Sequence, residues 1–327
     1  MHLCRFRHQG HSAVGFYDTH HVVPVAAAAN LFASETGQSL QLPQGDDLLD
    51  LLPPDGVAYS QTARLAAWVA ANPAVFNATS RLPVDSVELL VPIPRPNKLL
   101  LLAGNYAQHI EEGGGMAAER SETFPYVFMK PPSTTLTDPG KPIRIPNVSP
   151  HHIDWELELA VVIGRRAKHV AESEALNYVA GYTIVNDISD RRFRPNANRK
   201  QRDRDRFFDW LHGKWHDSFC PCGPCVLAAE PGMDPQSFPL QLRVNKVVKQ
   251  DSTTARQIFP VAAVIEFLSS FVTLEPGDLI ATGTPAGVGD ARGEYLKRGD
   301  RIEATIEPIG TLVSVVESDA LEHPGPI

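Results

Sequence analysis

The sequence lacks several features that would place the chain in a specialised class of protein. No apolar run approaches the ~20 residues of a membrane-spanning helix, and the first residues contain no long apolar segment of the secretory type. A positive net charge is also missing, since the formal charge is −8, and this argues against a general nucleic-acid binder. Neither internal repeats nor low-complexity segments are present. We therefore expect a cytoplasmic protein with no membrane or nucleic-acid partner.

Cysteine is scarce, and its spacing is not that of a common zinc site. Three of the four cysteines form one short cluster, at Cys220, Cys222 and Cys225. These thiols and the imidazoles of His212 and His216 are ligand types of zinc, but the usual arrangement of two Cys-x-x-Cys pairs is absent. We favour structural thiols on a proline-glycine turn over a zinc or redox site.

Proline and glycine are abundant, at 28 and 23 residues, and favour strands joined by turns over long helices. We expect an α+β fold that is mostly β. Residues 1–90 predict a small N-terminal α+β domain, with strands over 3–16 and 22–26 and a helix over 60–71 that ends at Asn72 and Pro73. Residues 91–96 contain three prolines and predict a stiff, extended linker. We place a domain boundary there and assign residues 91–327 to a catalytic domain.

The most informative stretch is residues 152–164, where polar and apolar residues alternate and then give way to an apolar run. This pattern predicts a β-strand that enters a core, and side chains two apart in a strand share a face. Asp154, Glu156 and Glu158 then crowd one face, which costs stability unless a cation lies among them. One interpretation is a solvent-exposed acidic edge. The other, which the apolar run favours, is a hard-cation site built from carboxylate oxygens.

Other elements are predicted along the rest of the chain. They are buried strands over 98–103 and 179–187, a hairpin over 240–249 turning at Asn245, a helix over 261–271, a strand from 279 into a glycine-rich loop ending near Gly289, and final strands over 301–306 and 311–316. Asp187 ends the second of these strands. It would reach the acidic stretch if the two strands are neighbours.

His109 and Glu112 follow the first buried strand and are three residues apart, so that on a helical turn they share a face. A carboxylate beside a histidine fixes its tautomer, which suits a general base. The three glycines at 113–115 predict a mobile flap. An ordinary surface His–Glu pair is the alternative interpretation.

Residues 191–206 are strongly basic, with eight Lys or Arg against two Asp. Alternating Arg and Asp favours a solvated loop, and a positive rim for an anionic substrate is a compatible interpretation.

Together these pieces resemble the fumarylacetoacetate hydrolase family. The resemblance covers about residues 95–318 and rests on ordered motifs at 104–112, 130–131, 154–159, 181–189, 213–224 and 282–289. It implies a mixed β-sandwich roll and a homodimer. It also implies a divalent cation at Glu156, Glu158 and Asp187, which would be Mg²⁺ or Mn²⁺, with Ca²⁺ as a further option.

The resemblance further implies roles for individual residues. His109 and Glu112 match a flap dyad that activates water once the lid closes, and Lys214 matches an active-site lysine. The residues matched to substrate binding are Tyr106, Lys130, Arg191 and Thr284. One departure is that the family usually continues Ala-Arg-Asp after residues 186–189, where this chain has Asp190, Arg191 and Arg192.

Family members act on 2-oxo and diketo acids. We therefore expect a metal-dependent hydrolase that cleaves a C–C bond of a 2,4-diketo acid of the acylpyruvate or fumarylpyruvate type, in aromatic catabolism. The arginines after Asp187 favour a diacid, because Arg191 is suited to bidentate binding of a distal carboxylate. Three alternatives stay open: an isomerase or decarboxylase of a 2-hydroxyhepta-2,4-diene-1,7-dioate-type ring-cleavage product, an oxaloacetate decarboxylase, and a non-catalytic binding protein.

Overall fold

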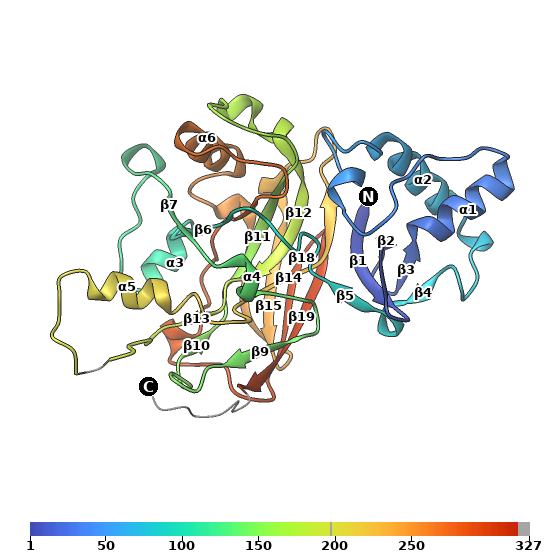
Figure 1. Cartoon of the computed structure of the whole chain (residues 1–327). Helices are drawn as coiled ribbons and strands as arrows, with labels where there is room; N and C mark the ends of the chain where they lie inside the picture. Colours follow the sequence, from blue (N-terminus) through green and yellow to red (C-terminus); the bar gives the residue numbers. More distant parts are fainter. Residues whose placement is uncertain (197, 320–327) are drawn as a thin grey trace.

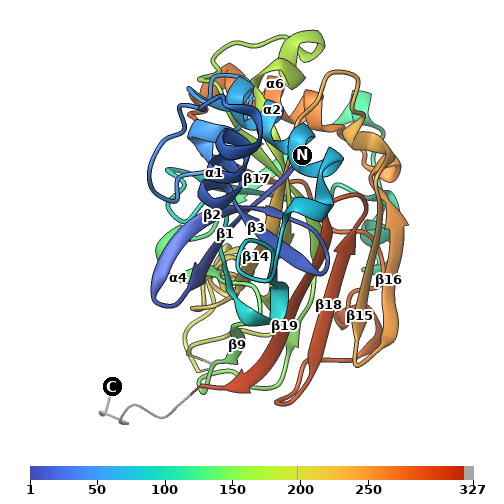
Figure 2. The same ribbon diagram turned by 90° about the vertical axis from the view of Figure 1, so that its right-hand side faces the viewer.

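Strands dominate the architecture and form two sheets that pack face to face (Figures 1 and 2). The structure is a computed structural model and describes residues 1–196 and 198–319. The larger sheet contains β1 (His2–His8), β2 (His11–Tyr17), β3 (His21–Pro24), β4 (Leu82–Pro83), β5 (Glu88–Leu90), β6 (Leu99–Ala103), β7 (Tyr126–Met129), β8 (Leu136–Thr137), β11 (Leu157–Ile163), β12 (Val179–Asn186), β14 (Cys220–Ala228) and β17 (Leu279–Ala281).

The smaller sheet contains β9 (Pro142–Ile145), β15 (Pro239–Val244), β16 (Val247–Thr253), β18 (Arg301–Ile306) and β19 (Gly310–Ser318), and a short ribbon pairs β10 (Ile153–Asp154) with β13 (Ser189–Asp190). The helices are α1 (Val25–Thr36), α2 (Tyr59–Ala71), α3 (Ala107–Glu112), α4 (Pro132–Thr135), α5 (Asp205–His212) and α6 (Val261–Phe271). Most strand pairs are antiparallel, but β17 runs parallel to β6, β19 parallel to β9 and β14 parallel to β8. The predicted fold class, α+β and mostly β with mixed sheets, is confirmed.

The central strand β11 divides the molecule into two cores. Leu157, Leu159 and Val161 belong to the cluster that includes residues of the smaller sheet. Ala160 and Val162 belong to a second cluster on the opposite face, together with residues of α1 and α2. Because side chains alternate along a strand, Glu158 lies in phase with Ala160 and faces away from the smaller sheet.

Several predicted elements are found with little change. The helix over 261–271 is α6, which has those same bounds, and the helix over 60–71 is α2, which starts one residue earlier. The hairpin at Asn245 joins β15 to β16, and its turn residues Asn245 and Lys246 have positive φ.

The predicted continuous strand over residues 152–164 is wrong. β10 ends at Asp154 and β11 begins at Leu157. Between them, the amide of Glu156 donates to the Asn186 side chain at 2.9 Å, and the amide of Leu157 donates to the Gln250 side chain at 3.0 Å. These amides are bound by side chains rather than by a neighbouring strand, and the ladder is therefore interrupted.

The cysteine cluster is not a turn but a strand. Cys220, Cys222 and Cys225 lie in β14, a fully buried strand between β1 and β12. Burial raises the pKa of each of these thiols, that of Cys220 to about 12, so all three stay protonated near neutral pH. They fit the structural role that we favoured.

Two expectations for the N-terminal residues also need correction. Residues 3–16 form two strands, β1 and β2, which turn at Gln9 and Gly10, both with positive φ. The second expected strand, 22–26, ends at Pro24, where α1 begins. We did not predict α1, although its alanine-rich sequence favours a helix.

The large sheet runs across the boundary expected near residue 91, because β1 pairs with β14. Within residues 91–96, the side chains of Val91 and Ile93 are buried in the core. The division into two domains therefore stays a prediction. No helix in the described part of the chain is long and apolar enough to cross a lipid bilayer.

Candidate metal centre and active site

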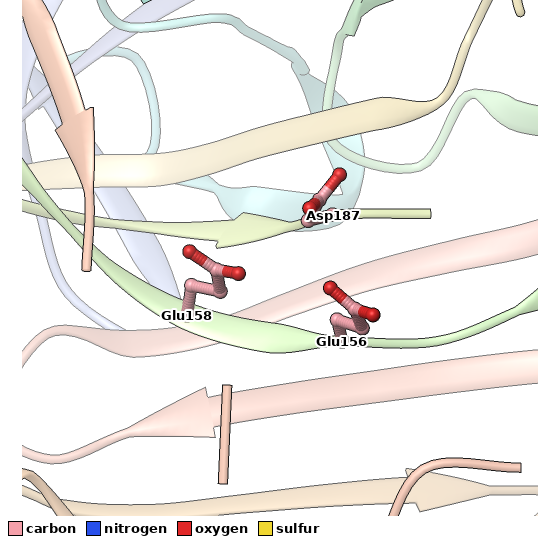
Figure 3. A group of neighbouring side chains, drawn as sticks. All are labelled: Glu156, Glu158 and Asp187. Carbon is pink, nitrogen blue, oxygen red and sulfur yellow. The ribbon is translucent and has the colours of Figure 1, made fainter. Parts of the chain in front are cut away.

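Three buried carboxylates meet where β11 and β12 lie side by side (Figure 3). Glu156 directly precedes β11, Glu158 lies within it, and Asp187 directly follows β12. One oxygen from each lies within 4.8 Å of the others, and each residue is at most 5% exposed. We call these three residues the carboxylate cluster. The interpretation of this stretch as a solvent-exposed acidic edge is wrong, and Asp187 does lie beside the two glutamates.

Lys214 bridges two members of the carboxylate cluster. Its Nζ donates to Glu156 Oε2 at 2.8 Å and to Asp187 Oδ2 at 2.6 Å. Burial opposes ionisation of Glu156, but Lys214 and then Arg191 lower its pKa well below the usual range. Glu156 is therefore charged at neutral pH, and Lys214 holds its ammonium group against the carboxylate cluster.

Glu158 is the least compensated member. Its Oε2 accepts from the amide of Gly283 at 2.8 Å, while its buried Oε1 has no hydrogen-bond partner. Burial, and then the charges of Asp187 and Glu156, raise the pKa of Glu158 well above the usual range. With all four carboxylates ionised, Asp154, Glu156, Glu158 and Asp187 exceed the cations Lys130, Arg191 and Lys214 by one charge.

These features fit a divalent cation. Carboxylate oxygens are the ligands that Mg²⁺, Mn²⁺ and Ca²⁺ prefer, and an orphaned buried oxygen at Glu158 is available for coordination. Within residues 1–196 and 198–319, the carboxylate cluster is the only group of three or more His, Cys, Asp or Glu side chains close enough to share an ion.

Lys130 lies behind Asp187 and not toward a substrate. Its fully buried Nζ donates to Asp187 Oδ1 at 2.5 Å, to the Phe219 carbonyl at 2.6 Å and to the Ile188 carbonyl at 2.9 Å. An ammonium group has three protons, and all three have acceptors. Lys130 therefore orients Asp187 and has no donor left for a ligand.

Arg191 is likewise engaged within the protein. Its Nε donates to Asp154 Oδ2 at 2.8 Å, and its Nη2 forms an ion pair with Glu156 Oε1 at 2.6 Å. Asp154 also accepts from the amides of Gly289 and Asp290, at 2.6 and 3.0 Å. Asp154 therefore does not join the carboxylate cluster, contrary to the expectation that it crowds the same face as Glu156 and Glu158.

His109 and Glu112 form the expected pair on α3. His109 Nδ1 lies 2.9 Å from Glu112 Oε1, and Glu112 Oε2 accepts from the amide of Gly287 at 2.8 Å. Burial alone would raise the pKa of Glu112, but these two hydrogen bonds outweigh it and lower that pKa. An ionised Glu112 accepts a hydrogen bond from Nδ1–H, which leaves Nε2 of His109 as the basic nitrogen. His109 is near enough to Glu156 to contribute to the lowered pKa of that residue.

Tyr106 and Thr284, which were matched to substrate binding, are both buried. Tyr106 directly precedes α3 and is buried, and burial raises the pKa of its hydroxyl, which stays protonated. Thr284 is buried in the glycine loop, which we define as residues 282–289, and its hydroxyl accepts from Gln250 Nε2 at 2.8 Å.

Gln250 is a supporting residue that sequence reasoning missed. Its fully buried side chain accepts from the Leu157 amide next to the carboxylate cluster, and donates to Thr284 and to the Pro285 carbonyl in the glycine loop. The only sequence signal is an isolated glutamine in a strand, which has no distinctive spacing.

Comparisons with known proteins cover most of the chain. A family model described as fumarylacetoacetate (FAA) hydrolase C-terminal matches residues 98–317. The mitochondrial oxaloacetate tautomerase FAHD2A of Bos taurus is 38% identical over 237 residues, which is 72% of this chain and 71% of that protein.

Two solved structures resemble nearly the whole chain. One is maleylpyruvate hydrolase from Sphingobium sp. SYK-6 in complex with manganese(II) and pyruvate, with a TM-score of 0.68, 25% identity, and coverage of 98% of this chain and 100% of that one. The other is 2-hydroxyhepta-2,4-diene-1,7-dioate isomerase from Mycobacterium marinum, with a TM-score of 0.64, 29% identity, and coverage of 98% and 99%.

Proposed function

The chain belongs to the fumarylacetoacetate hydrolase family, and from that premise we propose that it hydrolyses a carbon–carbon bond in a 2,4-diketo acid. The observation that supports this proposal most directly is the His109–Glu112 pair beside the buried carboxylate cluster. Such a site combines a general base that can deprotonate water with a carboxylate cluster whose bound cation would bind a 2-oxo acid.

We assign Glu156, Glu158 and Asp187 as ligands of Mg²⁺ or Mn²⁺, with Ca²⁺ as a less favoured ion. The unpaired oxygen of Glu158 and the excess negative charge support this assignment, and a relative was solved with manganese(II) and pyruvate. A bound divalent cation would act as a Lewis acid toward the 2-oxo and carboxylate oxygens of the substrate.

His109 is the proposed general base. Its Nε2 takes a proton from water as the water oxygen adds to the 4-carbonyl carbon, and Glu112 stabilises the resulting imidazolium. The bond between C3 and C4 then breaks, which releases a carboxylic acid and the enolate of the 2-oxo acid. The proton held by His109 returns to C3, and the products are a carboxylate and pyruvate or its analogue.

Lys214 is the second proposed catalytic residue. Its ammonium lies at the carboxylate cluster, where negative charge develops on the 2-oxo oxygen as the C3–C4 bond breaks. A positive group held there in advance stabilises the transition state. We propose positioning roles for Lys130, whose three donors all have protein partners, and for Arg191, which is ion-paired with Asp154 and Glu156.

Keto–enol tautomerisation of a 2-oxo acid is the second candidate function. The support is the 38% identity with a protein named oxaloacetate tautomerase. The same residues suit this reaction, since His109 would move a proton between C3 and the 2-oxo oxygen without any attack by water. The isomerase alternative has similar support from the Mycobacterium marinum structure. The cytoplasmic location and the homodimer likewise stay predictions.

A substrate panel tests the proposal. The Mn²⁺-supplemented protein is incubated with acetylpyruvate, maleylpyruvate and enol oxaloacetate, and ultraviolet absorbance and products are followed. We expect pyruvate and the matching acid from a diketo acid. Loss of the oxaloacetate enol without pyruvate release from any diketo acid would replace hydrolysis by tautomerisation, and carbon dioxide release would indicate a decarboxylase.

His109→Ala tests the proposed base. We expect turnover to fall by about 10²-fold or more, the usual loss for a general base, with Mn²⁺ affinity unchanged. The matched control is His11→Ala, at an exposed position in β2. A His109 variant with normal turnover would remove this residue from the mechanism.

A further inference from the structure

An aromatic pocket of about 600 Å³ opens between β7, α5 and α6. These three elements lie on the left of Figure 1. All three elements supply rings, and with the segment that leads into β7 these are Phe124, Tyr126, Phe128, Phe207, Trp210, Phe267 and Phe271. None of the described residues that line the pocket carries a charge.

The rings at the mouth of the pocket are unusually exposed. Phe124 is 58%, Phe207 53% and Phe271 62% accessible to solvent. Contiguous exposed apolar surface of this kind marks a binding site more often than an ordinary protein surface. The pocket is therefore suited to bind an apolar group.

Strand register places the inner wall of the pocket, at Ala103 and Phe128, on the same face of the large sheet as the carboxylate cluster, whereas Phe267 of α6 packs against the core on the other face. Ala160 of β11 lies opposite Ala281 of β17, which lies beside Leu101 of β6. Continuing this register by two residues along each strand places Glu158 opposite Gly283, whose amide it binds. The same step places Gly283 beside Ala103. Neighbouring strands are about 4.8 Å apart, so Ala103 at the pocket wall lies about 10 Å from Glu158.

Lys214 connects the two sites. Its Nζ donates to the carboxylate cluster and lies 5.3 Å from the centre of the Phe128 ring and 5.9 Å from that of Trp210. Both rings line the pocket. The inner wall of the pocket is thus the aromatic wall against which the proposed catalytic lysine rests.

We propose that the aromatic pocket binds the apolar acyl group of the substrate, so that the enzyme prefers diketo acids with an aryl or alkyl tail. This inference rests on the proposed function and names its substrate class. It replaces the expected preference for a diacid, because Arg191 is held by Asp154 and Glu156 and the pocket offers no positive group. An extended tail can span the distance from the cluster to the pocket.

The test compares two neighbouring phenylalanines of α5. Phe207 lines the pocket, whereas Phe208 does not and is similarly exposed, at 42% against 53%. For Phe207→Gln we expect the KM for benzoylpyruvate to rise about tenfold, the effect of losing one aromatic contact. The KM for acetylpyruvate should stay unchanged, and Phe208→Gln should leave both values unchanged.

Three results would overturn the proposal. The first is a wild-type kcat/KM for acetylpyruvate or maleylpyruvate equal to or above that for benzoylpyruvate. The second is an equal effect of Phe207→Gln on both monoacids. The third is a light-scattering measurement in which Phe207→Gln converts a dimer into a monomer, which would assign the pocket to a second copy of the chain.

A binding measurement separates this inference from the reaction itself. 2-Oxooctanoate has an apolar tail and no second carbonyl to cleave, so its affinity for the Mn²⁺-supplemented protein is independent of turnover. We expect calorimetry to give tighter binding of 2-oxooctanoate than of pyruvate, with the difference lost in Phe207→Gln. If this result is obtained while no diketo acid is cleaved, the proposed hydrolysis is wrong but the pocket still binds the apolar tail. Equal affinities for the two acids would overturn the pocket even with hydrolysis established.

Discussion

Glu158 is the residue on which the proposed metal site depends most. It contacts the Gly283 amide but no lysine or arginine among the described residues, and one of its oxygens has no partner. For Glu158→Gln we expect Mn²⁺ affinity to fall by at least about 100-fold, more than the loss typical of a supporting residue. Isothermal titration with Mn²⁺ measures this effect.

Cys222→Ala is the control for that measurement. Its thiol is buried in β14, outside the carboxylate cluster, so Mn²⁺ affinity should not change. Unaltered affinity in Glu158→Gln would exclude the carboxylate cluster as the metal site. If the wild type contains bound zinc and Cys222→Ala loses it, the interpretation of the cysteines as zinc ligands would be restored.

The raised pKa of Glu158 predicts how stability depends on pH. Burial, followed by Asp187 and Glu156, raises that pKa above its ordinary value of 4.5, so the folded metal-free protein holds a proton that the unfolded chain has lost. This contribution to stability is complete below pH 4.5 and is lost as the pH rises through the raised pKa.

We therefore expect the Tm of the chelator-treated protein to fall as the pH rises above 4.5 and through the raised pKa of Glu158. Excess Mn²⁺ should abolish this fall, because the cation replaces the proton. Thermal scans of the wild type and of Glu158→Gln, with and without Mn²⁺, measure both effects. If the metal-free variant keeps the full slope, another group is responsible.

Two pairs of candidate site residues could be proposed from local spacing, but the contacts of the candidate residues could not. Glu156 and Glu158 are two apart beside a strand, and His109 and Glu112 are three apart on a helix, so each pair is set by local geometry. Lys130 and Arg191 were assigned to a substrate instead. Their partners come from distant segments, and the spacing of residues along the chain does not say which segments meet.

Among the elements of the site, the glycine loop makes contacts with the largest number of acidic side chains. Its amides at Gly283, Gly287 and Gly289 donate to three carboxylates from different elements: Glu158 of β11, Glu112 of α3 and Asp154 of β10. The loop thus holds the flap helix and the proposed metal site in one arrangement.

Gly287→Ala tests this function of the loop. Gly287 has φ +105°, and an added Cβ would collide with the backbone carbonyl of Lys249. We expect a loss of about 2–4 kcal/mol of unfolding free energy from the strained φ and the forced shift. Turnover should fall as well, because the shift removes the amide that holds Glu112.

Gly293→Ala is the matched control. Gly293 also has a positive φ, +66°, but an added Cβ meets open space. It should cost only about 1–2 kcal/mol, the penalty of a left-handed residue, without a loss of turnover. Chemical denaturation and kinetics compare the two variants. Equal effects would mean that the collision with Lys249 is relieved by an easy movement.

The elements that were predicted correctly are those whose pattern is complete within one segment. α6 has an apolar face at helical spacing and begins after Pro260, and both signals are local. The break between β10 and β11 depends on Asn186 and Gln250, which lie about 30 and 93 residues further along the chain. No property of residues 152–164 alone encodes it.

For the whole molecule, the main feature that the sequence did not indicate is the continuity of the large sheet. β1 pairs with β14, and His2 lies opposite Leu227. Pairing over such a separation is set by the packing of the complete chain, whereas the proline-rich segment at 91–96 is a local signal. The same segment nevertheless separates the residues of the proposed site from residues 1–90.

A fragment of residues 91–327 tests how far the two parts depend on each other. The family model matches only 98–317, and the polar contacts described for the site involve no residue before 91. Removing residues 1–90 uncovers an edge of β14. It also uncovers apolar residues such as Val162 and Ala180, which share a cluster with Leu48 and Leu52.

We therefore expect the fragment to bind Mn²⁺ with an affinity within about threefold of the full chain, well inside the 10-fold loss seen when a supporting residue is removed. Its Tm should be lower by roughly 10 °C or more, since each lost kcal/mol shifts the Tm of a domain of this size by about 2–4 °C. Titration and thermal scans of both proteins measure these effects. A folded fragment that binds no Mn²⁺ would mean that residues 1–90 hold the carboxylate cluster in place through the shared core. A fragment as stable as the full chain would mean that the pairing of β1 with β14 adds little to the stability of the sheet.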